Sequence, residues 1–241
     1  MKGKEKLIVA LDVPTAREAR ELVIALRGVV GMFKVGSQLF TEAGPDIVRE
    51  IVRSGESVFL DLKFHDIPNT VAAAGVEAMR LGVSIFNIHA AGGSEMMRQT
   101  VATVSEAATA EGRTRPAIIA VTVLTSANAT TLSEVEICAD LEKHAVALAL
   151  LSEACGMDGV VASPLEIEVV RASVQRRNFL VVTPGVRPAD SSAHDQKRIM
   201  TPGEAILAGA DYLVVGRPII KAKDPVRAAE DIVREMSRNL T

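Results

Sequence analysis

The chain has 241 residues, of which 48% are hydrophobic and 24% charged, a composition typical of a soluble globular protein with a sizeable core. Its formal net charge is −3, and its lysines and arginines form no long block, which disfavours nucleic acid and anionic membranes as partners. Only 3% of the residues are aromatic, so few side chains are available to stack on nucleic-acid bases.

Short β-branched runs alternate with amphipathic helical patterns from one end of the chain to the other. The predicted strands are Leu7–Leu11, Met32–Val35, Val58–Lys63, Ser84–His89, Ala117–Leu124, Gly159–Ala162, Phe179–Thr183 and Tyr212–Val215. The predicted helices are Ala16–Leu26, Pro45–Ser54, Val71–Leu81, Glu95–Ala110, Leu141–Cys155, Leu165–Ser173, Pro202–Ala208 and Val226–Arg238. This alternation predicts an α/β fold, a (β/α)8 TIM barrel, formed by residues 1–241 as a single domain.

A doubly wound open sheet is the alternative for the same alternation. It would normally use fewer strands, and it often carries a glycine fingerprint after its first strand. Here the first strand ends in Asp12-Val13-Pro14, and no low-complexity linker divides the chain. The barrel is therefore the better interpretation.

The segment from Asp61 to Thr70 reads Asp-Leu-Lys-Phe-His-Asp-Ile-Pro-Asn-Thr and follows the apolar run Val58–Leu60. Side chains alternate along a strand, so Asp61 and Lys63 point the same way where the third strand ends. The simpler interpretation is that Asp61 and Lys63 form a structural ion pair at the end of the sheet. The third charge, Asp66, and the rigid turn after it favour a functional site, because ionised groups are rarely buried without a partner or a task.

Other polar residues fall at the same ends of other predicted strands, which is where TIM barrels build their active sites. They are Asp12, Lys34, Asn87, His89, Thr125, Ser126, Arg187, Gly216 and Arg217. After the seventh and eighth strands, glycines permit close backbone approach and arginines supply charged donors, which indicates a phosphate site. Ordinary turns remain the alternative there, since turns use the same dipeptides.

The connection from Thr125 to Ile137 is either a lid over the catalytic face or an ordinary surface loop. His89 is expected to be structural, and no His, Cys, Asp or Glu set has convincing spacing for a metal. Cys138 and Cys155 are expected to be reduced thiols of a cytoplasmic protein, because the first apolar run is far too short for a signal peptide or a membrane span.

The segment from Asp61 to Thr70 resembles the signature of the orotidine 5′-phosphate decarboxylase family in its bacterial form. The similarity extends along essentially the whole chain. It includes Ala10-Leu11-Asp12, Phe33-Lys34-Val35-Gly36, Val121-Thr122-Val123-Leu124-Thr125-Ser126, Thr183-Pro184-Gly185-Val186-Arg187, Asp195-Gln196-Lys197-Arg198 and Val214-Val215-Gly216-Arg217-Pro218. The central decapeptide is highly specific, whereas the flanking pieces would be weak individually.

This resemblance implies a cytoplasmic, cofactor-free homodimer that converts orotidine 5′-monophosphate (OMP) to uridine 5′-monophosphate (UMP) and carbon dioxide, with no metal. It implies that Lys63 donates a proton to C6 within a charged array with Lys34 and Asp61, and that Asp66 reaches in from the other subunit. The other implied contacts are Asp12, Lys34 and Thr70 to the ribose, Thr125 or Ser126 to the pyrimidine, and Arg187, Gln196, Gly216 and Arg217 to the phosphate.

Two rival functions remain at this stage. A metal-dependent sugar-phosphate decarboxylase or aldolase on the same barrel would share the Asp61, Lys63 and Asp66 spacing and use Mg²⁺. The continuation through Thr70, together with Gln196, argues against that rival. A catalytically silent phosphate- or nucleotide-binding barrel is the second rival, because a fold alone does not fix a function.

Overall fold

The computed structural model describes residues 3–137, 140–187 and 200–238. Within them, parallel strands close into a barrel in chain order, with β1 hydrogen-bonded to both β2 and β8. The strands are β1 (Leu7–Ala10), β2 (Met32–Gly36), β3 (Val58–Phe64), β4 (Ile85–His89), β5 (Ala117–Val121), β6 (Gly159–Val161), β7 (Leu180–Pro184) and β8 (Tyr212–Val215). The predicted (β/α)8 barrel is confirmed.

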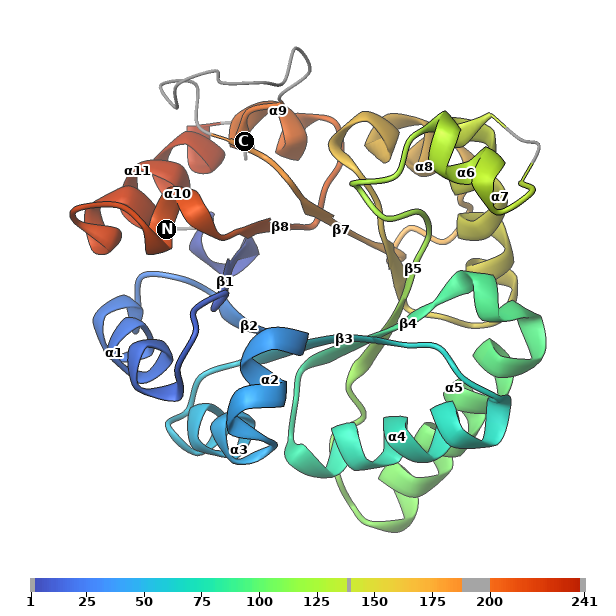
Figure 1. The fold of residues 1–241 in the computed structure, drawn as a ribbon, viewed down its shortest axis with the longest axis horizontal. Coiled ribbons are helices and arrows are strands. Elements are labelled where there is room, and N and C mark those ends of the chain that lie inside the picture. The colour runs from blue at the N-terminus through green and yellow to red at the C-terminus, as the bar shows by residue number, and fades with distance from the viewer. Residues whose placement is uncertain (1–2, 138–139, 188–199, 239–241) are drawn as a thin grey trace.

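The helices form a ring outside the strands (Figure 1). They are α1 (Ala16–Leu26), α2 (Ser37–Ala43), α3 (Asp46–Arg53), α4 (Pro68–Leu81), α5 (Gly93–Ala110), α6 (Ala129–Glu134), α7 (Leu141–Ala154), α8 (Ile167–Ser173), α9 (Pro202–Leu207), α10 (Arg217–Ile220) and α11 (Pro225–Arg238). Three short 3-10 turns are η1 (Lys4–Lys6), η2 (Ala90–Gly92) and η3 (Pro164–Glu166). Within the described chain, no helix combines the length and the apolar character that crossing a membrane requires.

The strands separate two apolar layers, because successive side chains point to opposite faces. Side chains such as Phe33, Leu60 and Phe86 point outward and pack under the helices. A smaller cluster fills the interior of the barrel. It consists of Ile8, Ala10, Met32, Phe59, Ile85, Ile119, Val121, Val161, Val182 and Val214. The interior is therefore a packed core, and a ligand has access only at its ends.

Helix α4 begins earlier than the hydrophobic periodicity predicts, at Pro68 instead of Val71. Proline is well suited to the first turn, because its fixed φ matches the helix and its missing N–H would have no intrahelical partner there. The helix ends at Leu81, and the residue that caps it, Gly82, has a φ of +82°. The early start places Thr70 in the first turn of the helix, next to the end of β3.

Helices α2 and α6 were not predicted. The connection from Thr125 to Ile137 contains α6. The side chain of Asn128 accepts a hydrogen bond from the Thr131 amide at 3.0 Å and so caps that helix. Helix α2 begins directly after β2 without an intervening loop.

Candidate active site

The polar residues predicted at the strand ends continue the inward face of the barrel. Each of three lies two positions beyond an apolar residue of the interior cluster: Lys34 after Met32, Asp61 after Phe59, and Asn87 after Ile85. All three are buried, with exposed fractions of 8%, 8% and 0% respectively. The interior core thus ends in a polar layer at the carboxyl end of the strands.

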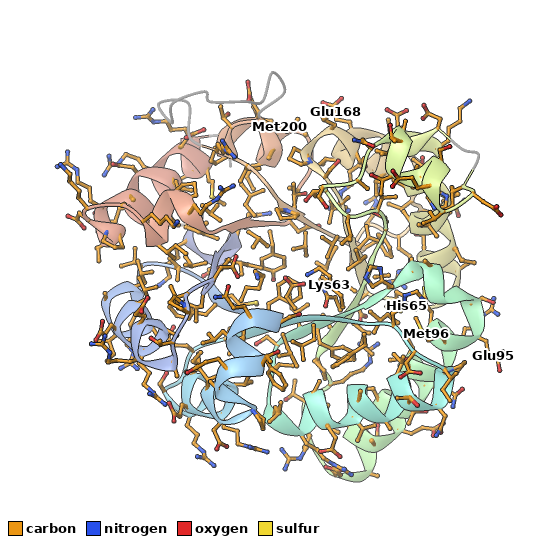
Figure 2. All side chains as sticks on the ribbon, viewed as in Figure 1. Lys63, His65, Glu95, Met96, Glu168 and Met200 are labelled. Atoms are coloured by element: carbon orange, nitrogen blue, oxygen red, sulfur yellow. The ribbon has the colours of Figure 1, made fainter. Side chains whose placement is uncertain are left out.

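Lys34, Asp61 and Lys63 form a continuous charged array in this layer. The Asp61 carboxylate lies between two ammonium groups, with Oδ2 at 3.1 Å from Lys34 Nζ and Oδ1 at 2.7 Å from Lys63 Nζ. Lys34 Nζ also donates to Asp12 Oδ1 at 3.1 Å. Only 9% of the Lys34 side chain is exposed, compared with 34% for Lys63. Figure 2 shows Lys63 near the middle of the ring of strands.

Mutual attraction keeps the buried members of this array ionised. Burial acts to lower the pKa of Lys34, but Asp61 and Asp12 outweigh it and raise that pKa above its ordinary value of 10.5. Burial acts to raise the pKa of Asp61, but Lys34 and Lys63 outweigh it and hold that pKa below its ordinary value of 3.8. The site therefore presents fixed charges to a ligand at neutral pH.

The backbone carries Lys63 in an unusual conformation. Its φ is +53°, in the left-handed region that residues other than glycine rarely adopt. The pairing of β3 with β4 also shifts there, since Leu60 pairs with Phe86 and Phe64 pairs with Ile88. Two more residues of β3 than of β4 lie between these pairs, and this irregularity reorients the strand where Lys63 leaves it.

Asn87 is the residue of β4 that lies between Phe86 and Ile88, opposite the irregular part of β3. Its Oδ1 accepts a hydrogen bond from the Lys63 amide at 2.8 Å, and its Nδ2 donates to Asp61 Oδ1 at 2.7 Å. The sequence placed Asn87 at the end of the fourth strand but did not make it a site residue. The available signal was a single amide at an inward position of an otherwise apolar strand.

Asp66 and Thr70 lie just after the end of β3, Asp66 before α4 and Thr70 in its first turn. Both are exposed, and so is 67% of the apolar side chain of Ile67 between them. The Asp66 carboxylate accepts a hydrogen bond from the Ile67 amide at 2.6 Å. Among the described residues, Lys63 pairs with Asp61, and Asp66 forms no ion pair.

Among the predicted phosphate residues of the last two strands, Gly216 lies close to the array. Gly185 follows β7 with a φ of +87°, and Gly216 precedes α10. A Cβ atom placed on Gly216 would be 3.6 Å from Asp12 Oδ2, so the end of β8 borders the charged array. Arg187 is half-buried and Arg217 is exposed.

The other predictions from the sequence concern the contacts to the base and the phosphate, the cysteines and a metal. Thr125 and Ser126, one of which is predicted to contact the base, follow β5 and are both exposed. Gln196 and Cys138 lie outside the described residues. Cys155 is a buried free thiol, and burial raises its pKa. In the part of the chain that the structure describes, no three or more His, Cys, Asp or Glu side chains are grouped so that they could hold a metal ion.

Two histidines lie beside the array. The rings of His65 and His89 are 5.2 Å apart between centroids. Burial, and then the proximity of His65 and Lys63, lower the pKa of His89. Neutral His89 fits the supporting role that the sequence predicts. His65 lies further toward α5 than Lys63 does (Figure 2).

Comparison with known proteins gives a consistent assignment. The family described as "Orotidine 5′-phosphate decarboxylase / HUMPS family" matches residues 5–232. The chain belongs to this family. Family members named orotidine 5′-phosphate decarboxylase include a protein of Syntrophotalea carbinolica, which is 53% identical over 100% of this chain and 98% of its own length. Another, from Geobacter sulfurreducens, is 52% identical over 97% of each chain.

A solved structure supports the same relationship. The crystal structure of orotidine 5′-phosphate decarboxylase from Lactobacillus acidophilus matches with a TM-score of 0.84 and 36% identity. The match covers 95% of this chain and 98% of that chain. The barrel, from its first strand to its last helix, is therefore the fold of this family.

Proposed function

We propose that this chain is an OMP decarboxylase, which converts OMP to UMP and carbon dioxide in pyrimidine biosynthesis without a cofactor. The observation that carries the proposal is the array of Lys34, Asp61 and Lys63 at the carboxyl end of a barrel of this family. The names of the relatives at 52–53% identity support the same activity.

The chemistry explains why an ammonium is needed. Loss of carbon dioxide leaves the electron pair of the broken C–C bond on C6, in the plane of the ring, where the π-system cannot delocalise it. A fixed ammonium beside C6 stabilises this charge as it develops and then donates a proton to the carbon. The amine takes up a proton from solvent before the next turnover.

Lys63 suits the role of proton donor. Its Nζ is held 2.7 Å from Asp61 Oδ1, yet about a third of its side chain remains exposed. Lys34 is more deeply buried, and its ammonium lies between Asp12 and Asp61. We assign Lys34 to electrostatic support and ribose binding. We also assign to Asp61 a repulsion of the substrate carboxylate that is relieved when carbon dioxide leaves.

The other substrate contacts follow the rim of the barrel. The end of β8 borders Asp12, so a phosphate held there would leave the ribose next to Asp12 and Lys34. We assign Asp12, Lys34 and Thr70 to the ribose, Thr125 or Ser126 to the pyrimidine, and Arg187, Gln196, Gly216 and Arg217 to the phosphate.

The active form is proposed to be a cytoplasmic homodimer. Asp66 and Thr70 are exposed on one chain, beside the exposed apolar side chain of Ile67. A second copy would cover Ile67 and bring its own Asp66 and Thr70 to the neighbouring active site. The free thiol of Cys155 is compatible with a reducing compartment.

A spectrophotometric assay with OMP tests the proposal directly. We expect the absorbance change of conversion to UMP, with the same rate in buffer that contains EDTA. Activity that disappears in EDTA and returns with Mg²⁺ would instead indicate the metal-dependent rival, which stabilises an enediolate. A folded chain that binds UMP but does not convert OMP would be the silent binding protein.

A further inference from the structure

Asn87 is a fully buried amide whose two ends bind two different parts of the charged array. Its exposed fraction is 0%. Its carbonyl oxygen accepts from the Lys63 backbone amide at 2.8 Å, and its NH₂ group donates to Asp61 Oδ1 at 2.7 Å. A buried amide with both ends bonded is expensive to remove, because each lost bond leaves a buried group unsatisfied.

The bond to the Lys63 amide replaces a bond of the β-sheet. Regular pairing between β3 and β4 is interrupted between Leu60 and Phe64, so the Lys63 amide cannot take its usual place in the ladder. The same residue has a φ of +53°, which an L-residue adopts only when its surroundings hold it there. Asn87 supplies the acceptor that this conformation requires.

The bond to Asp61 completes the set of donors around that carboxylate. Oδ1 accepts from Lys63 Nζ at 2.7 Å and from Asn87 Nδ2 at 2.7 Å, and Oδ2 lies 3.1 Å from Lys34 Nζ. Asn87 therefore bonds both to the backbone that carries the ammonium of Lys63 and to the carboxylate that pairs with that ammonium.

We propose that Asn87 is a positioning residue for decarboxylation: it locks the left-handed backbone of Lys63 and the carboxylate of Asp61 into one rigid unit, so that the Lys63 ammonium is held in one place. This inference rests on the proposed function. It assigns Asn87 no contact with substrate. Its effect is on the placement of a reacting group, where an error of about 1 Å costs roughly a hundredfold in rate.

The side-chain chemistry of asparagine fits both bonds. The site needs one acceptor and one donor, close together on a short and uncharged side chain. An ionised aspartate has the same shape but lacks the donor, and its charge would repel Asp61. Alanine lacks both groups. Asn87→Ala therefore removes both bonds, whereas Asn87→Asp keeps the acceptor for the Lys63 amide and removes only the donor to Asp61.

The first test compares Asn87→Ala with the wild type and with Thr100→Ala. Thr100 is equally buried, and its hydroxyl bonds the Met96 carbonyl at 2.7 Å within α5, so its loss controls for general destabilisation. We expect Asn87→Ala to lower kcat about a hundredfold with UMP affinity changed less than about fivefold, and Thr100→Ala to leave both within about threefold. Activity, calorimetric UMP binding and circular dichroism provide the readouts.

The second test uses the pH profile of Asn87→Asp. At neutral pH the new carboxylate cannot donate to Asp61, so kcat should fall. As the pH decreases, the carboxyl group introduced at position 87 takes up a proton in preference to Asp61, whose pKa Lys34 and Lys63 hold low, and the missing donor returns. We therefore expect the kcat of the variant, relative to the wild type, to rise toward acid pH. A profile parallel to that of the wild type would overturn the proposal.

The outcomes separate this inference from the proposed function. An inactive wild type rejects the proposed function itself. An active wild type with an Asn87→Ala variant whose kcat is within threefold rejects only the role of Asn87. Loss of folded protein in both Asn87 variants would also overturn the proposal, because the residue would then be a structural part of the barrel.

Discussion

Substitution of Asp61 by asparagine tests whether the charged array stabilises the folded chain. Asparagine has nearly the same shape, so the change removes the charge without creating a cavity. The Lys34 ammonium would then remain in a buried position after losing the carboxylate oxygen at 3.1 Å. Its other partner, Asp12, is 53% exposed in its side chain and is a weaker partner. Asp61→Asn should therefore destabilise the protein.

The expected magnitude follows from the burial of each partner. Removing one member of a buried ion pair costs about 3–5 kcal/mol, because the remaining charge stays desolvated. Lys63 is 34% exposed in its side chain and can turn toward water, so Lys34 carries most of the cost. The lower value of about 3 kcal/mol is therefore expected. For a chain of this size it corresponds to a decrease in Tm of roughly 6–12 °C.

Thermal and urea unfolding, followed by circular dichroism at pH 7, measure this difference. Asp231→Asn is the matched control, because the Asp231 carboxylate pairs with Arg234 at 2.8 Å on the surface of α11, where both side chains are more than half exposed. That control should change the free energy of unfolding by less than about 0.5 kcal/mol. An Asp61→Asn variant as stable as the control would refute the reasoning.

Three further predictions follow from the same geometry. Arg217→Ala should lower kcat/KM roughly a hundredfold through loss of one charged hydrogen bond to phosphate, and a loss below about threefold in steady-state assays would refute phosphate anchoring. The raised pKa of Lys34 means that its stabilising contribution is complete below pH 10.5 and is lost as the pH rises through the higher folded value. Wild type should therefore lose more stability than Lys34→Met above about pH 10.5 in urea titrations, and equal losses would contradict this. Lys63→Ala and Asp66→Ala subunits, each inactive alone, should recover partial activity when mixed, and no recovery after demonstrated subunit exchange would exclude a shared site.

The sequence predicted the barrel and the charged pair for physical reasons that apply to any parallel barrel. Strand ends meet at one rim, so Lys34 and Asp61 could be placed together although they lie on different strands. Alternation along β3 also put Asp61 and Lys63 on the same side, and the structure brings their charged atoms to 2.7 Å. These predictions needed only the strand positions and the period of two.

The role of Asn87 could not be predicted in the same way. It depends on the shifted pairing of β3 with β4 and on the positive φ of Lys63, and neither follows from side-chain periodicity. Helix α2 was missed for a related reason. Two turns of helix directly after β2 give too short a periodic pattern to be distinguished from a continuation of the strand.

The most direct test of the account is the turnover of OMP by Lys63→Ala, with Lys143→Ala as control. Lys143 is an exposed lysine in the first turn of α7, a helix that contributes no member of the array. We expect Lys63→Ala to remain folded and to lose nearly all turnover, and Lys143→Ala to match the wild type. A Lys63→Ala variant that releases carbon dioxide at the wild-type rate would contradict the assignment of Lys63 as the proton donor.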